Sequence, residues 1–444
     1  MLANDFKEVR QSLQEILAES SVDSDLFLAK KCLLENISFQ LPATADSDRL
    51  IGLREWFRNS KKIFSSHKAT AKLREGGTSA VLGGFMRQSS AIQSYIEFES
   101  GEKLSWYFGK AEWPEMPKGS KFFYWLNWSV ACIPFIRKSI FATNRVNWAL
   151  LIRELNDTTV FIHWLRQNNI RRLYDFLPYE LESNWISLLC RQLGIETIKI
   201  PSSGPLATHN STLIADKIVL SSPYHHEELK VFSNSIRYES LLKWGPERAL
   251  TYIERYRTYK PESSKSVIGF YSHASWLRLA QDHADVGLNI PKAEEKLLND
   301  LFRFVNENKE FELRIFLHPR ERAPEMIEAT KSYYNSKLGE GKYQFNDFSK
   351  PTTACFEDAG IAMAAFSTIL FERLFSGYKT LIGNYGIPDF PLKGSNLNAI
   401  CFSDYNRLSL LIEECTRESD SDFFKRNKLE DYLWTQYPSW QMRS

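Results

Sequence analysis

Two short segments of the chain carry side chains that could bind a phosphate group. The first, FELRIFLHP, has strand character and ends in His318-Pro319. Because proline cannot continue a central ladder, Pro319 ends the strand and fixes the direction in which the chain leaves it. A histidine at that point can donate a hydrogen bond to a phosphate oxygen and, when protonated, offset the charge of a leaving group. The alternative is a half-buried histidine that only ends a strand.

The second segment, AGIAMAAFSTILFERLFSG, lies about fifty residues further on. It combines a small apolar strand with a helix that starts at Ser367 and Thr368. Ser367 fits the N-cap position, and N–H groups and hydroxyls at the positive end of a helix form a phosphate cradle. Glu372 follows about one turn later and could reach a pair of ribose hydroxyls. An ordinary N-cap and a surface glutamate are the alternative, but the joint occurrence of both segments favours phosphate binding.

A shorter loop in the same half of the chain, GFYSHASW, follows a predicted strand. Gly269 and Ser272 would lie at the same rim, where Ser272 or His273 could contact phosphate. An ordinary connecting loop explains this weaker signal equally well.

The elements that must position these side chains alternate between strand and helix in two series. The first series is expected from about Asn144, where TTVFIHWLRQNN is strand-like or a short helix, and the second follows the polar segment Thr258–Lys265. Such alternation predicts parallel sheets. We therefore expect an α/β protein of two doubly wound, Rossmann-like domains facing a cleft, with ligands at the carboxyl ends of the strands. The first expected domain is 1–257, which includes a helical N-terminal extension, and the second is 266–425. Residues 426–444 are expected to form a C-terminal helix that could cross back to the first domain.

The motif pair also resembles a known family. A strand ending in His-Pro, then a strand ending in Ser-Ser or Ser-Thr with a following glutamate, is similar to the donor half of GT-B glycosyltransferases. It is most similar to bacterial enzymes that use CMP-activated sugars, the sialyltransferases and Kdo transferases. The resemblance covers residues 266–384 well and 144–232 loosely. It implies that His318, Ser367 and Thr368 hold the phosphate and cytidine of the donor, and that the first domain binds the acceptor.

The function that this resemblance implies is transfer of a sugar, a nonulosonic acid or Kdo, from a CMP donor to a bacterial surface glycan. The nucleotide-sugar donor and the glycan acceptor would be the partners, without a cofactor and without a metal. The same motif pair occurs in polyol-phosphate polymerases that use CDP-glycerol, so a CDP-polyol phosphotransferase is one alternative. A GT-B enzyme with a UDP- or GDP-hexose donor and a non-catalytic glycan-binding scaffold are the others.

The acceptor half has a candidate general base in RRLYDFLPYELES. Transfer with inversion needs a carboxylate that takes the proton of the acceptor hydroxyl. The bacterial sialyltransferases place a Tyr-Asp-Asp-Gly segment here, whereas this chain has Tyr174-Asp175-Phe176 and lacks the second acid and the glycine. Asp175 is the expected base and Glu180 the second candidate. Alternatively, both acids are charges at the start of a helix.

Charge and cysteine content argue against several other classes of protein. The 444 residues carry a net charge of +2, which requires no nucleic-acid partner. The six cysteines are scattered without a CxxC pair, which indicates reduced thiols and a cytoplasmic protein. Three Asp-x-Asp pairs occur in polar segments, where we interpret them as solvated acids and not as a metal site.

One aromatic segment, Lys121–Lys138, has the sequence KFFYWLNWSVACIPFIRK between basic ends. It is interrupted by Asn127 and Pro134. Rings in a membrane interface with cations on lipid phosphates would give a peripheral contact with the inner face of the membrane. A buried helix and turn is the alternative, and the one we favour at this stage.

Overall fold

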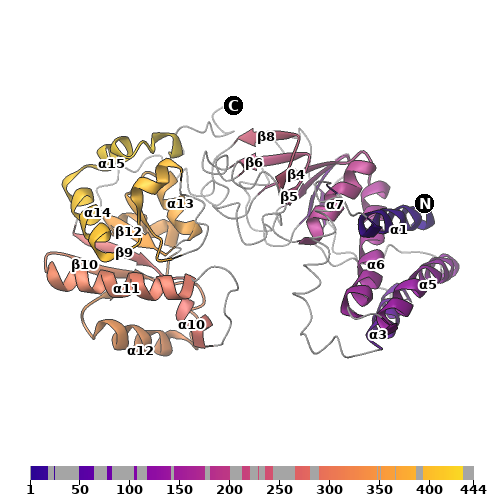
Figure 1. Ribbon diagram of the computed structural model, residues 1–444, viewed down its shortest axis with the longest axis horizontal. Helices are drawn as coiled ribbons and strands as arrows, with labels where there is room; N and C mark the ends of the chain where they lie inside the picture. Colours follow the sequence, from indigo (N-terminus) through magenta and orange to yellow (C-terminus); the bar gives the residue numbers. More distant parts are fainter. Residues whose placement is uncertain are drawn as a thin grey trace. The chain divides into compact units, whose positions relative to one another are not determined.

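The computed structural model describes residues 2–18, 25, 50–64, 78–82, 105–107, 118–141, 145–175, 181–200, 213–220, 229, 236–243, 266–280, 290–347, 349–350, 352–365, 367–386 and 394–433. The chain forms two compact units (Figure 1). The predicted linker Thr258–Lys265 lies outside the described residues.

The first unit is built on a six-stranded sheet with the order β2-β1-β3-β4-β6-β8. Its strands are β1 (Ser79–Leu82), β2 (Ser105–Tyr107), β3 (Arg172–Asp175), β4 (Glu196–Lys199), β6 (Lys217–Leu220) and β8 (Ser240–Lys243). The pairs from β2 through β6 are parallel, as the alternation predicts. A second pair, β5 (Leu213–Ile214) with β7 (Ile236–Arg237), is also parallel. Three of the four residues in β3 and in β4 are buried, which is typical of strands covered on both faces.

The helices of this unit are α1 (Leu2–Ala18), α3 (Ile51–Phe64), α5 (Lys118–Phe141), α6 (Arg145–Gln167) and α7 (Leu181–Gln192). Helix α6 contacts α1, α3 and α5, so these four helices form one layer of the core. The segment 158–169, predicted to be a strand or a short helix, is helical, and most of it belongs to the C-terminal part of the long helix α6. Ile152, Leu155, Ile162 and Leu165 recur on one buried face, as in an α-helix.

A buried ion-pair cluster fixes α1 against α6. The Asp5 carboxylate is fully buried and lies 2.7 Å from Nδ1 of His163 and 2.5 Å from a guanidinium nitrogen of Arg166. Arg166 also pairs with Glu8 at 2.6 Å. Burial raises the pKa of Asp5, but the hydrogen bonds and charges of His163 and Arg166 outweigh it and hold that pKa below its ordinary value.

The second unit contains a six-stranded sheet with the order β11-β10-β9-β12-β13-β14, in which every neighbouring pair is parallel. Its strands are β9 (Val267–Tyr271), β10 (Glu312–Phe316), β11 (Gln344–Phe345), β12 (Ile361–Ala364), β13 (Thr380–Gly383) and β14 (Cys401–Phe402). All residues of β9, β12 and β13 are buried, which explains their continuous apolar sequences. Taken in chain order, the sheet has the order 3-2-1-4-5-6 of a doubly wound dinucleotide-binding fold.

The helices of the second unit are α10 (Ser275–Ala280), α11 (Ile290–Glu307), α12 (Ile327–Leu338), α13 (Thr368–Phe375), α14 (Tyr405–Arg417) and α15 (Asp420–Arg426), with 3-10 helices at Thr352–Asp358, Asn396–Ile400 and Glu430–Tyr432. Both sheets therefore confirm the predicted α/β class with two Rossmann-like, doubly wound domains. None of the described helices combines the length and the apolar character that a bilayer span requires.

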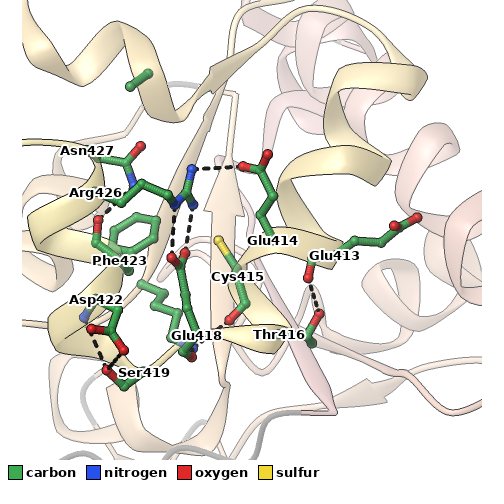
Figure 2. Close-up of polar contacts among 12 residues, drawn as sticks. Glu413, Glu414, Cys415, Thr416, Glu418, Ser419, Asp422, Phe423, Arg426 and Asn427 are labelled. Atoms are coloured by element: carbon green, nitrogen blue, oxygen red, sulfur yellow. Dashed lines mark hydrogen bonds and ion pairs between the residues drawn. The ribbon is translucent and has the colours of Figure 1, made fainter.

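A network of polar contacts makes the corner between α14 and α15 (Figure 2). Arg426 donates to both oxygens of Glu418, at 2.9 and 2.7 Å, and to Glu414 at 2.8 Å. Ser419 is the N-cap of α15 and accepts from the N–H of Asp422 at 3.1 Å. The acid pair Asp420/Asp422 belongs to the first turn of this helix. Asp422 is exposed, as the interpretation as solvated acids predicts, whereas the Asp420 carboxylate is 14% exposed and lies 3.6 Å from Nζ of Lys379, so that interpretation was wrong for Asp420.

The chain after α15 was predicted to form a helix that could cross to the first domain. In the described part it does not, because Leu429 and Tyr432 pack into the core of the second unit around a single 3-10 turn. Residues 434–444 lie outside the described residues.

Candidate functional site

The candidate site lies at the carboxyl ends of β9, β10 and β12. The chain order places a topological switch point between β9 and β12, because the connections leaving these neighbouring strands run toward opposite edges of the sheet. Open α/β sheets bind ligands at such a point. Sequence reasoning could not locate the switch point, since it depends on which strands are neighbours. It does coincide with the predicted motifs, since Ser272, His318 and Ser367 all follow these three strands.

His318 is held in a tight turn directly after β10. Its backbone N–H donates to the Glu321 carboxylate at 2.8 Å, and its carbonyl accepts from the Glu321 N–H at 2.9 Å. The ring nitrogen Nδ1 accepts from the N–H of Arg320 at 3.2 Å. An acceptor at Nδ1 places the proton of the neutral ring on Nε2, which is then a donor. Pro319 is exposed in this turn, consistent with its predicted role of ending the strand.

Ser367 and Thr368 begin α13 at the carboxyl end of β12, as predicted. Ser367 is the N-cap by position, with extended backbone, but its hydroxyl makes no capping hydrogen bond. Both residues are half-buried. Hydroxyl groups and helix N–H groups at the positive end of α13 are the donor set that a phosphate requires.

The distance between the two predicted motifs follows from the sheet. Strand β9 lies between β10 and β12, so the loops that carry His318 and Ser367 start about 10 Å apart, which is two strand spacings. Glu372, on the same helix as Thr368, is only 7% exposed. Its contact with a ribose stays a prediction.

The loop after β9 is organised by internal hydrogen bonds. The Ser272 hydroxyl accepts from the N–H of Ala274 at 2.9 Å and also contacts the Glu321 carboxylate. Ala274 has a φ of 55°, which is rare for a residue with a side chain. Ser272 is buried and its hydroxyl shapes the turn, while its predicted contact with phosphate stays a prediction.

Gly269 has a packing role in the structure, and its predicted place in the nucleotide-sugar site stays a prediction. It lies inside β9, where a Cβ atom would come within 2.9 Å of the Phe316 ring and 3.0 Å of the Cβ atoms of Ala359 and Ala362. Only glycine allows this close approach of β9 to its neighbours.

Two buried glutamates under these loops were missed by sequence reasoning. Glu294 of α11 accepts from the backbone N–H groups of His273, at 2.8 Å, and Ser275, at 3.3 Å. Burial raises the pKa of Glu294 to about 8; the N–H donors oppose this rise, and the nearby charge of Glu321 adds to it. The sequence did contain a sign that Glu294 is buried, since it lies on the apolar face of α11 with Ala293, Leu297 and Leu301.

Glu321 is the second of these glutamates, and it is fully buried. Besides the N–H of His318, it accepts from the Trp276 indole at 2.8 Å and from the Tyr334 hydroxyl at 3.2 Å. Burial raises its pKa, and these donors oppose the rise. Glu321 therefore connects the turn that carries His318 to the loop after β9 and to α12.

Two arginines also position the loops around the site. Arg322 donates to the carbonyl of Leu317 at 2.8 Å and to the hydroxyl of Thr352, so it braces the end of β10. Arg373 of α13 is fully buried and donates to the Ala359 carbonyl at 2.7 Å and the Tyr271 hydroxyl at 3.3 Å. It thereby fixes α13 against the end of β9.

In the first unit, Asp175 lies at the carboxyl end of β3, next to the switch point between β1 and β3. Its carboxylate is buried and lies 3.6 Å from Nζ of Lys199, which is itself fully buried. Lys199 also donates to Asn184 at 2.6 Å. Asp175 balances the buried charge of Lys199, and this structural role is enough to explain why an acid occupies the position. The role of Asp175 as a general base stays a prediction. Glu180 lies outside the described residues.

Metal ligation has no candidate among the residues that the structure describes, where no group of three or more His, Cys, Asp or Glu side chains comes together. The donor set at β10 and β12 consists of a histidine, hydroxyls and a helix end, which suits an anionic group.

Comparison with known proteins gives distant structural similarity alone. No protein-family model matches the chain, and no curated protein matches it. Among solved structures, the chain is similar to a Thermobaculum terrenum O-GlcNAc transferase, with 12% identity over 88% of this chain and 71% of that one and a TM-score of 0.41. It is also similar to a UDP-N-acetylglucosamine 2-epimerase from Rickettsia bellii, with 12% identity over 80% and 93% of the chains and a TM-score of 0.44. A third similar structure is Acinetobacter baumannii MurG, with 11% identity over 79% and 98% of the chains and a TM-score of 0.39. The fold assignment rests on the strand order of the two sheets, which defines a chain with two doubly wound α/β domains.

Proposed function

We propose that the protein is a GT-B glycosyltransferase whose second domain binds a nucleotide-activated sugar. The observation that carries this proposal is the position of His318 and of Ser367-Thr368 at the carboxyl ends of strands on either side of β9. A ring N–H at one strand end and a helix N-terminus two strands away can hold a phosphate between them.

The donor that we propose is a CMP-activated sugar, because the His-Pro and Ser-Thr motifs resemble those of CMP-sugar transferases. In the reaction, the bond between the anomeric carbon and the phosphate oxygen of CMP breaks, and a bond from the acceptor oxygen forms. The negative charge that develops on the leaving phosphate would be stabilised by His318 Nε2–H and by the positive end of α13. Because these groups already lie at the ends of β10 and β12, they would stabilise the developing negative charge without side-chain rearrangement.

The acceptor hydroxyl must lose its proton during transfer, and we propose the Asp175 carboxylate as the base. The carboxylate lies 3.6 Å from Nζ of the buried Lys199, so an acceptor hydroxyl would have to approach it beside this ion pair. Replacement by Asn removes the base while keeping the shape of the side chain.

Calorimetric titration of the full chain with CMP, CDP, UMP, UDP, GDP and ADP tests the donor proposal. We expect CMP to bind most tightly and His318→Ala to weaken it about 10- to 100-fold, the value of a hydrogen bond to a charged group. Glu325→Ala is the matched control, because Glu325 is exposed on the same connection between β10 and α12. Its affinity for CMP should equal that of the wild type.

Three other outcomes are informative. Preference for UDP or GDP would overturn the cytidine assignment and point to a hexose donor. Transfer from CDP-glycerol in place of CMP-sugars would indicate a polyol phosphotransferase. Absence of nucleotide binding would refute the site at β10 and β12 and leave a glycan-binding scaffold.

A further inference from the structure

Helix α5 is apolar on its outer face as well as on its inner face. Its inner face packs into the core through Tyr124, Trp128, Cys132 and Phe135. The opposite face carries large apolar side chains at three- and four-residue spacing, and Phe123, Ile133 and Phe141 are 65%, 59% and 79% exposed. The other exposed apolar residues of this helix are Phe122, Leu126 and Val130. A helix that is apolar all round needs a second apolar environment.

Helix α3 extends this surface. Phe57 and Phe64 are 64% and 49% exposed, and the Phe64 ring lies 5.9 Å from the ring of Trp125 on α5. The two helices are held in register by hydrogen bonds from Trp56 to Ser129, at 3.1 Å, and from Trp125 to Ser60, at 2.9 Å. The α3–α5 face, defined as Phe57, Phe64, Phe122, Phe123, Leu126, Val130, Ile133 and Phe141, is therefore one preformed surface.

Cations surround the α3–α5 face, and its two helices expose no acid. Helix α5 contains no Asp or Glu at all. The single acid of α3, Glu55, is buried and pairs with Arg58 at 2.5 Å. The exposed or half-buried cations at the rim are Arg54, Arg58, Lys61, Lys62, Lys121, Arg137 and Lys138.

Helix α1 shows that this composition is specific to α3 and α5. It packs on the same core helix, α6. Yet its exposed positions are polar, and they include Lys7, Glu8, Gln11 and Glu15. Lys62 of α3 pairs with Asp157 of α6 at 3.5 Å, but α3 and α5 themselves expose cations and no acid, which distinguishes their apolar outer face from that of α1.

We propose that the α3–α5 face docks the protein on an anionic lipid bilayer, with α5 lying parallel to the membrane surface. Aromatic and aliphatic side chains would enter the interface, while the surrounding Lys and Arg side chains reach the lipid phosphates. A second copy of the chain fits less well. A two-fold interface through this face would bring its cations against the same cations of the other copy. The proposal is independent of the transfer reaction and would also hold if the nucleotide assignment failed.

Vesicle sedimentation of the full chain tests the proposal. We expect it to bind vesicles of phosphatidylcholine and phosphatidylglycerol at a 7:3 ratio, with binding that weakens as salt rises, and to bind pure phosphatidylcholine at least tenfold more weakly. The double variant Phe123→Ser/Ile133→Ser and the charge variant Arg58→Glu/Lys61→Glu should each lose at least tenfold of the anionic binding. Leu410→Ser is the matched control, since Leu410 is a 47% exposed apolar residue on α14 of the other unit.

Either of two results would overturn the proposal. One is wild-type protein that stays in the supernatant with anionic vesicles or binds them as tightly as both variants do. The other is a dimer by light scattering that the Phe123→Ser/Ile133→Ser variant converts to a monomer, which would assign the face to a second copy. Far-UV circular dichroism and nucleotide titration of each variant separate a lost docking surface from a lost fold or a failed nucleotide site.

Discussion

The buried Glu294 makes the stability of the second domain depend on pH in a direction opposite to that of most acids. Its pKa is raised from 4.5 to about 8 on folding, mainly through burial. The folded state therefore keeps a proton that the unfolded state releases above pH 4.5. Stability is unaffected by this group below that pH and falls as pH rises toward 8. Each pH unit well below the folded pKa costs about 1.4 kcal/mol and the slope falls to half at the folded pKa, so the loss between pH 6 and pH 8 is about 2 kcal/mol.

The substitution Glu294→Gln should remove this pH dependence. Glutamine is neutral at every pH and nearly isosteric with the protonated acid, although it loses one acceptor for the N–H groups of His273 and Ser275, at a cost of about 1 kcal/mol. We expect the variant to be less stable than the wild type only below about pH 5, about 1 kcal/mol more stable at pH 6, and about 3 kcal/mol more stable at pH 8. Urea unfolding of the full chain, followed by circular dichroism at pH 6, 7 and 8, measures the change.

The neighbouring Glu295→Gln is the control for this experiment. Glu295 lies on the same helix, but its carboxylate is 38% exposed and pairs with Lys337. Its replacement should leave the pH dependence of unfolding unchanged. If Glu294→Gln and the wild type lose stability in parallel between pH 6 and pH 8, the carboxyl group is not held protonated and the reasoning is refuted.

Three further predictions concern the framework of both domains. Asp5→Ala should destabilise the first domain by about 3 kcal/mol at pH 7, because it breaks a buried pair with His163. The pKa of Asp5 is depressed in the fold, so its contribution is present above the unfolded pKa of 3.8 and lost as pH falls further; in urea unfolding, a difference from the wild type that does not shrink as pH falls below 3.8 would contradict this. Lys199→Met should cost about 3–5 kcal/mol because it leaves the Asp175 charge buried without its ion pair, and adding Asp175→Asn should recover much of that loss in the same assay. Ala274→Gly should raise the melting temperature, since glycine relieves a left-handed backbone strain of about 1 kcal/mol, and an unchanged or lower value would argue against strain at this turn.

Local signals in the sequence were enough to predict the class of fold. The strands β9, β12 and β13 are covered on both faces, so their apolar sequences are continuous and easy to recognise. The same signals left strand and helix open for residues 158–169 in α6, because a mostly buried helix resembles a strand when only a short apolar window is considered. The position of His318 at a strand end and of Ser367 at a helix start also followed from sequence, since proline and capping residues act locally.

The tertiary structure decided what these residues contact. It showed that Ser272 bonds within its own loop, that Gly269 serves packing, and that Asp175 is paired with Lys199 across neighbouring strands. It also brought Glu294 and Glu321, which lie 27 positions apart in the sequence, under the same loops. Burial and charge pairing depend on distances through space, and these are fixed by strand order and helix packing. The sequence by itself thus determined the helices, the strands and the residues whose side chains could bind a ligand or react. The folded chain determined which of these residues are exposed, which are buried, and which hold the others in place.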